Sequence, residues 1–161
     1  MNKTKFLAEP GKQELFIERE FDAPRELLFK AHTDPELYRQ WLGPKNLETR
    51  FEIFEPQSGG SFRFINFDDQ GNEDVFYGVY HKVIEPELMI GTFEWEGMPN
   101  HPSLEKAEFQ ELPGNRSKVI SHSVFLSIED RDGMMADDAM KQGVNEGYEK
   151  LDELLEKLKK S

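Results

Sequence analysis

The sequence predicts an α+β domain in which a long amphipathic C-terminal helix packs across an antiparallel sheet. Between residues 47 and 126, short alternating segments are separated by turn signals, as is typical of antiparallel strands joined by short links. Between about Asp132 and Lys160, the apolar residues instead recur at steps of three and four, as they do along one side of a helix. Such a helix needs a large apolar surface to cover, and only the predicted sheet provides one.

The composition limits the classes of function. The chain has 161 residues, and one domain of this length removes about 70% of its unfolded surface from water. Its net charge of -12 repels a phosphate backbone and its basic residues do not cluster, so nucleic acid is not an expected partner. Cysteine is absent, which excludes disulfides and thiolate sites. No apolar run suits a membrane span or a signal peptide, so a cytoplasmic protein without membrane contact is expected.

The N-terminal part is predicted to contain an arm and then a strand. Residues 1–13 lack periodicity and include Pro10-Gly11, so we expect a flexible arm there and a single domain over residues 14–161. From Glu14 to Phe21, apolar and acidic residues alternate, which predicts a half-buried strand.

Two short helices are predicted directly after this strand. The segment Asp22-Ala23-Pro24 ends the strand and begins a helix to about Thr33, with Asp22 as its expected cap. Asp34-Pro35-Glu36 repeats the same signal, and Gly43-Pro44 ends the second helix.

Six further strands are predicted, which gives about seven in all. Each is an alternating segment between turn-forming residues. They are Leu47–Phe54, Ser61–Phe67, Asp74–Ile84, Leu88–Trp95, Leu104–Leu112 and Arg116–Leu126.

Several motifs accompany this order of one strand, two short helices, six strands and a long helix. They are Arg19-Glu20-Phe21-Asp22-Ala23-Pro24, Thr33-Asp34-Pro35-Glu36, Gly59-Gly60-Ser61-Phe62-Arg63-Phe64, Gly78-Val79-Tyr80, Glu85-Pro86-Glu87 and Thr92-Phe93-Glu94-Trp95. In this order they resemble the helix-grip or START-like (SRPBCC) superfamily, specifically bacterial proteins related to the activator of Hsp90 ATPase. The resemblance implies a curved sheet that grips the helix around a cavity for apolar ligands such as lipids, polyketides or flavonoid-like compounds. The superfamily that the chain resembles also includes co-chaperone domains and cyclases, so the fold alone selects no function.

The first half of the last helix is the predicted wall of this cavity. Its candidate ligand-binding residues are Met140, Gly143, Val144 and Gly147. The two glycines, four residues apart, indicate either close packing of the helix on a strand or room for a ligand. Many relatives carry Gly-Trp where this chain has Gly143-Val144, and a different ligand preference is expected there.

Aromatic and polar residues on the strands supply further candidates. Tyr80 and Trp95 each bring a polar atom that needs a partner when it is buried. Arg19 shares a strand face with apolar residues, which indicates either a structural ion pair or a ligand contact. His122 alternates with apolar residues and is expected to point inward, as a core residue or a ligand contact.

The leading hypothesis is a non-enzymatic binding protein for a small hydrophobic or aromatic molecule. The alternatives are a protein-interaction module of the co-chaperone kind, or a cyclase-like or hydrolytic enzyme that uses His122 or Arg19. The histidine spacing fits no metal motif, and no phosphate-binding loop or Ser-His-acid set is evident. No catalytic residue, metal or cofactor is therefore assigned.

Overall fold

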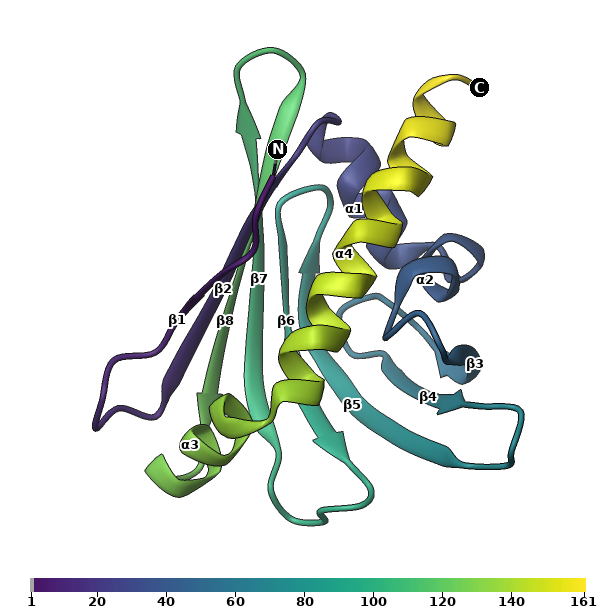
Figure 1. Ribbon diagram of the computed structural model, residues 1–161. Coiled ribbons are helices and arrows are strands. Elements are labelled where there is room, and N and C mark those ends of the chain that lie inside the picture. The colour runs from purple at the N-terminus through teal and green to yellow at the C-terminus, as the bar shows by residue number, and fades with distance from the viewer. Residues whose placement is uncertain (1) are drawn as a thin grey trace.

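The computed structural model describes residues 2–161 and shows one sheet of eight strands, crossed on one face by the last helix (Figure 1). Every neighbouring pair of strands is antiparallel, in the order β1-β2-β8-β7-β6-β5-β4-β3. The strands are β1 (Lys5–Leu7), β2 (Glu14–Phe21), β3 (Glu48–Phe54), β4 (Ser61–Phe67), β5 (Glu73–Ile84), β6 (Leu88–Trp95), β7 (Ser103–Leu112) and β8 (Arg116–Phe125). The helices are α1 (Arg25–Thr33), α2 (Pro35–Trp41), α3 (Ile128–Ala136) and α4 (Asp138–Lys159).

The predicted α+β fold class is confirmed, with one strand more than expected. The additional strand is β1, which pairs with β2 and forms one edge of the sheet. It lies inside the segment predicted as an arm, and its three residues are too few to show an alternating pattern.

The two short helices follow β2 as predicted, but they begin differently. Asp34 caps α2, because its carboxylate accepts hydrogen bonds from the backbone N–H groups of Glu36 and Leu37. The expected cap at Asp22 is wrong: α1 begins after Pro24 without a side-chain cap. Asp22 instead binds the guanidinium of Arg116, with 2.8 Å between Oδ1 and Nε.

The C-terminal segment forms two helices rather than the single helix predicted from Asp132 to Lys160. The chain is extended at Asp137, whose side chain caps α4 by accepting a hydrogen bond from the Ala139 N–H at 3.0 Å. An aspartate that binds the backbone in this way competes with helix continuation. The hydrophobic core lies between α4, α1 and the face of the sheet that α4 crosses, called here the inner face. The core residues include Phe21, Leu28, Phe109, Leu151 and Leu155.

No helix among residues 2–161 combines the length and the apolar character needed to cross a bilayer.

Candidate ligand-binding site

Strands β3 to β6 place a group of aromatic side chains on the inner face, because alternate residues of a strand share one face. This aromatic strip consists of Phe51, Phe54, Phe62, Phe64, Phe76, Tyr80, Phe93 and Trp95. Its rings are in contact: the centroids of Phe64 and Phe76 lie 5.2 Å apart, as do those of Phe76 and Phe93. Tyr38 of α2 stacks on its β3 end, 5.7 Å from Phe51.

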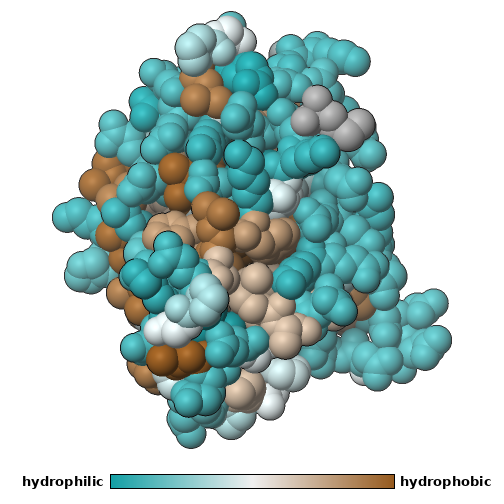
Figure 2. Space-filling view, turned by 60° about the vertical axis from the view of Figure 1, so that its left-hand side comes forward, coloured by the Kyte–Doolittle hydropathy of each residue, from teal (hydrophilic) through white to brown (hydrophobic). Residues whose placement is uncertain are grey.

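Much of the aromatic strip remains accessible although it faces the helical side of the protein. Phe64 is buried, but Phe62, Phe76 and Phe93 are only partly buried. Trp95, at the end of β6, keeps 42% of its surface exposed. On the side of the molecule where β1 and β2 lie, Figure 2 shows a continuous apolar area bordered by hydrophilic surface. The partial burial of Phe62, Phe76 and Phe93 shows that the strip offers apolar surface beyond what the core uses.

The two halves of α4 differ in how closely they pack. Leu151 and Leu155 in the second half are buried in the core. Met140 and Val144 in the first half are only partly buried. The structure thus places these two predicted ligand-binding residues on the less closely packed half of α4.

The two glycines of α4 face the end of α2 and the chain after it, not a strand. A Cβ atom on Gly147 would lie 2.9 Å from the carbonyl oxygen of Trp41, so this glycine permits close helix packing. A Cβ atom on Gly143 would meet only Pro44, at an ordinary 3.6 Å. Close packing therefore explains Gly147 but not Gly143.

The surface has two recesses, and Phe62 is the one member of the aromatic strip that lines either of them. One of about 210 Å³ is lined by residues that include Asp152 and Leu155, in the second half of α4. The other, of about 370 Å³, lies on the outer face beside Arg63 and Val79. Arg63 pairs there with Glu96, on the opposite face of β4 from its neighbours Phe62 and Phe64.

A carboxyl group lies on the inner face beside the aromatic strip. Glu105 of β7 accepts hydrogen bonds from the hydroxyls of Ser103 and Ser123, the latter at 2.7 Å. Burial raises the pKa of this carboxyl, and the two hydroxyls act in the opposite direction by stabilising the charged form. Glu105 was not among the residues predicted from the sequence. The available signal was its alternation with Ala107 and Phe109, which puts the carboxyl on the same face as these two apolar residues.

Glu105 and Tyr80 belong to one row of residues that runs across the strands. Tyr80 of β5 lies opposite Gly91 of β6, Gly91 lies opposite Glu105, and Glu105 lies opposite Ser123 of β8. Gly91 separates the phenol from the carboxyl, and a Cβ atom on it would lie 2.5 Å from the Val79 carbonyl oxygen, so this glycine permits the close approach of β5. Burial, and to a lesser degree Tyr38, raises the pKa of Tyr80, which keeps its hydroxyl protonated.

Arg19 lies on the inner face, but it binds α4. Its guanidinium donates to the carbonyl oxygen of Tyr148 at 3.1 Å and to the Asp152 carboxylate at 2.8 Å. The side chain is only 5% exposed. The interpretation of Arg19 as half of a structural ion pair is therefore confirmed.

The prediction that His122 points inward is wrong. His122 lies on the outer face, where its ring stacks on Phe16 at 4.3 Å and its Nε2 lies 3.3 Å from Glu14. The inward positions of β8 are taken by Ser117, Val119 and neighbouring small residues. This position removes His122 as a candidate catalyst beside the aromatic strip. In the described part of the chain, no three His, Asp or Glu side chains are placed to hold a metal ion.

Comparison with solved structures shows the same fold in bacterial proteins. A protein from Rhodobacter sphaeroides superposes with a TM-score of 0.86 and 24% identity over 96% of this chain and 99% of its own. One from Mycobacterium smegmatis gives 0.83 and 18%, over 94% and 96%. An AHSA1 protein from Silicibacter pomeroyi gives 0.71 and 21%, over 88% and 96%.

A comparison with curated proteins found no match. The family described as "Activator of Hsp90 ATPase homolog 1-like protein" matches residues 22–156, a segment that includes α1, α2, β3 to β8, α3 and most of α4. The chain therefore belongs to this family, as the resemblance in its sequence predicted.

Proposed function

We propose that the protein binds a small hydrophobic or aromatic molecule on the aromatic strip, beside the first half of α4. The observation that carries this proposal is the partial exposure of inner-face aromatic rings. Phe62, Phe76 and Phe93 face the helical side of the protein, yet the core does not cover them fully. Ligand sites are typically concave and mostly apolar, with a few polar groups that fix orientation, and Tyr80 and Glu105 are such groups here.

An apolar ligand would remove this remaining surface from water. Each square ångström of apolar surface buried contributes roughly 25 cal/mol before the costs of association, so a ligand with one or two fused rings has enough area for measurable affinity. Lipids, polyketides and flavonoid-like compounds offer surfaces of this kind. The cytoplasmic location expected from the sequence is part of the same proposal.

The test is a ligand screen with two neighbouring variants. Native mass spectrometry identifies members of the three compound classes that bind, and isothermal titration gives their affinities for Phe76→Ala and Tyr77→Ala. Phe76 belongs to the strip, whereas Tyr77 is the next residue of β5 and lies on the outer face. We expect Phe76→Ala to weaken binding at least tenfold and Tyr77→Ala to leave it nearly unchanged. The proposal fails if no compound binds, or if the two variants have equal effects.

A protein-interaction role is the second candidate. The outer face exposes 43% of Ile53 and 54% of Val79 beside the recess near Arg63, and a partner protein could cover this apolar surface. A pull-down with the wild-type protein and Val79→Glu tests this role. Partners that bind both proteins equally, or no partner at all, would count against it.

A further inference from the structure

We propose that the ligand of the aromatic strip carries a protonated amine, and that this amine pairs with the Glu105 carboxylate. The inference rests on the proposed function, because it adds a polar group to the apolar ligand proposed above. It comes from the position of Glu105, from the absence of an ion-pairing cation for it among residues 2–161, and from the groups that surround it.

Glu105 lies at the level of the first half of α4. The Ser121 hydroxyl on β8 lies close enough to the Tyr148 phenol on α4 to lower the pKa of that phenol, against the larger rise caused by burial. Glu105 is opposite Ser123, the next inward position of β8, which is about 7 Å closer to α3. The same distance along α4 corresponds to about four or five residues, which is the stretch around Gly143 and Val144. The carboxyl thus faces the less closely packed half of the helix.

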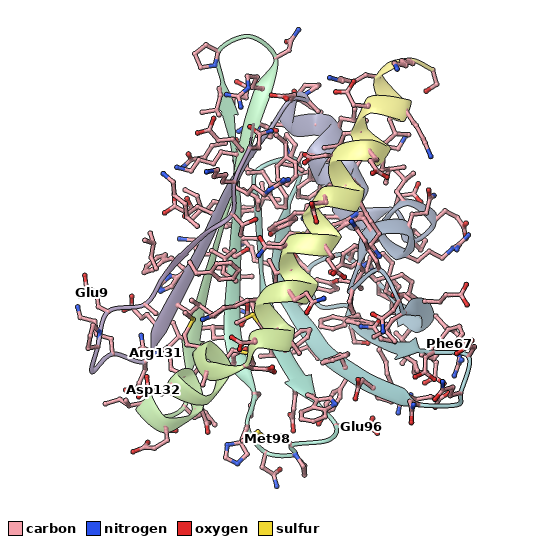
Figure 3. The ribbon with its side chains drawn as sticks, viewed as in Figure 1. Glu9, Phe67, Glu96, Met98, Arg131 and Asp132 are labelled. Atoms are coloured by element: carbon pink, nitrogen blue, oxygen red, sulfur yellow. The ribbon has the colours of Figure 1, made fainter. Side chains whose placement is uncertain are left out.

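No cation in the described part of the chain compensates Glu105. Among residues 2–161, no Lys, Arg or His forms an ion pair with this carboxyl. Two buried arginines have other partners. Arg19 binds Asp152. Arg131 binds the Glu14 carbonyl oxygen and Asp132, and Figure 3 labels Arg131 and Asp132 beside α3. Glu105 is partly buried, and partial desolvation of a carboxylate without a counter-ion is unfavourable, so a cationic ligand would gain the interaction that the protein does not supply.

The carboxyl retains the capacity to accept further hydrogen bonds. An ionised carboxylate has about four lone-pair sites, and Ser103 and Ser123 each occupy one. Both hydroxyls donate to Glu105, and these hydrogen bonds stabilise its ionised form, which is the form that accepts from an ammonium group. An ammonium group is a donor only and therefore matches the remaining sites.

The rest of the row also favours a cation attached to an aromatic body. Tyr80 lies two strands, or about 10 Å, from Glu105, so a ring attached to an amine on Glu105 can extend over the inner face towards the phenol. Tyr80 and Phe93 present aromatic faces that attract cations as well as rings. The net charge of -12 disfavours an anionic ligand in the same place.

The experiment compares three naphthalene compounds that differ only in their polar end: 2-(1-naphthyl)ethylamine, 2-(1-naphthyl)ethanol and 1-naphthylacetate. Their affinities are measured by titration calorimetry at pH 7 for wild type, Glu105→Gln and Glu108→Gln. Glu108 lies on the outer face of the same strand, where it pairs with Lys106, so its variant makes the same change of charge away from the strip. Circular dichroism checks that each variant is folded.

We expect the amine to bind wild type at least tenfold more tightly than the alcohol, with the carboxylate weakest. Glu105→Gln should bring amine and alcohol to within about twofold of each other, and Glu108→Gln should keep the wild-type ratio. The inference is overturned if amine and alcohol bind wild type equally, or if Glu105→Gln keeps the preference for the amine. In either case, binding of the alcohol still supports the proposed apolar site. If none of the three compounds binds, both proposals fail.

Discussion

Arg19 of β2 and Asp152 of α4 form an ion pair across the inner face, with 2.8 Å between Nη2 and Oδ2. The same guanidinium lies 5.0 Å from the centre of the Phe21 ring. A single side chain therefore links the second half of α4 to the strand that joins the N-terminal and C-terminal parts of the sheet.

Asp152→Asn should destabilise the protein, because it leaves the buried Arg19 cation without its carboxylate. We expect the free energy of unfolding to fall by about 1–3 kcal/mol, as measured by urea denaturation. Glu153→Gln is the matched control, since Glu153 is exposed on the next position of α4 and forms no ion pair within the described residues. Equal losses in the two variants would show that the Arg19 pair contributes no more than a surface charge.

Gly143→Ala and Gly147→Ala should have opposite effects. Alanine is favoured over glycine inside a helix by about 1 kcal/mol, and at Gly143 the added methyl meets only Pro44 at ordinary contact distance. At Gly147 the methyl would lie 2.9 Å from the backbone oxygen of Trp41, so α4 must move away from α2. Thermal melting should show a higher Tm for Gly143→Ala and a Tm lower by several degrees for Gly147→Ala. A rise in both variants would contradict the close approach of α4 to Trp41.

The sequence predicted most of the fold because alternation and helical spacing report local structure. The segments Ser61–Phe67 and Leu88–Trp95 were predicted with the bounds that the structure shows. The break at Asp137 was not predicted because it depends on the conformation of one residue. The aspartate side chain binds a backbone N–H and begins a new helix, where one helix could have continued. The acidic and polar residues on both sides of Asp137 gave no periodic signal of that conformation.

The site was harder to predict than the fold, because it depends on which face each strand turns inward. In β8, apolar residues flank His122 on the outer face, whereas several inward positions are serines, so hydrophobicity indicated the wrong face. Glu105 was missed for the related reason that its strand is rich in charged residues on both faces. The register between strands assigns His122 to the outer face and Glu105 to the inner face. The sequence of a single strand does not contain this register.

The stability of the protein should fall between pH 6.5 and pH 4 in part because of His32. Burial lowers the pKa of His32 to about 4, while its Nδ1 lies 2.8 Å from the Leu28 carbonyl oxygen and Trp41, Phe109 and Tyr38 surround its ring. An unfolded histidine has a pKa of about 6.5, so as the pH falls the unfolded chain takes up the proton first. The stability that the neutral ring contributes is therefore present above pH 6.5 and is lost as the pH falls towards 4.

His32→Phe removes this proton while keeping an aromatic ring among the same neighbours. Urea denaturation at pH 7, 6, 5 and 4 should show a smaller loss of stability for the variant than for wild type, with a difference of at most about 1.4 kcal/mol per pH unit in that range. His81→Gln, which replaces an exposed histidine, is the control and should follow wild type. Parallel curves for wild type and His32→Phe would mean that other groups cause the acid sensitivity.

Val144→Trp should close the aromatic strip to ligands. Val144 is partly buried on the first half of α4, and the larger indole would extend over the inner-face surface that we propose for the ligand. The affinity for 2-(1-naphthyl)ethanol, measured by titration calorimetry, should fall at least tenfold, while Tm stays the same or rises because the indole buries additional apolar surface.

Asn145→Trp places the same ring on the exposed side of α4 and should leave the affinity unchanged. The indole added by Val144→Trp should fluoresce at shorter wavelength than the one added by Asn145→Trp, since only the former is shielded from water. If the probe binds Val144→Trp as tightly as wild type, the ligand does not lie beneath this part of α4.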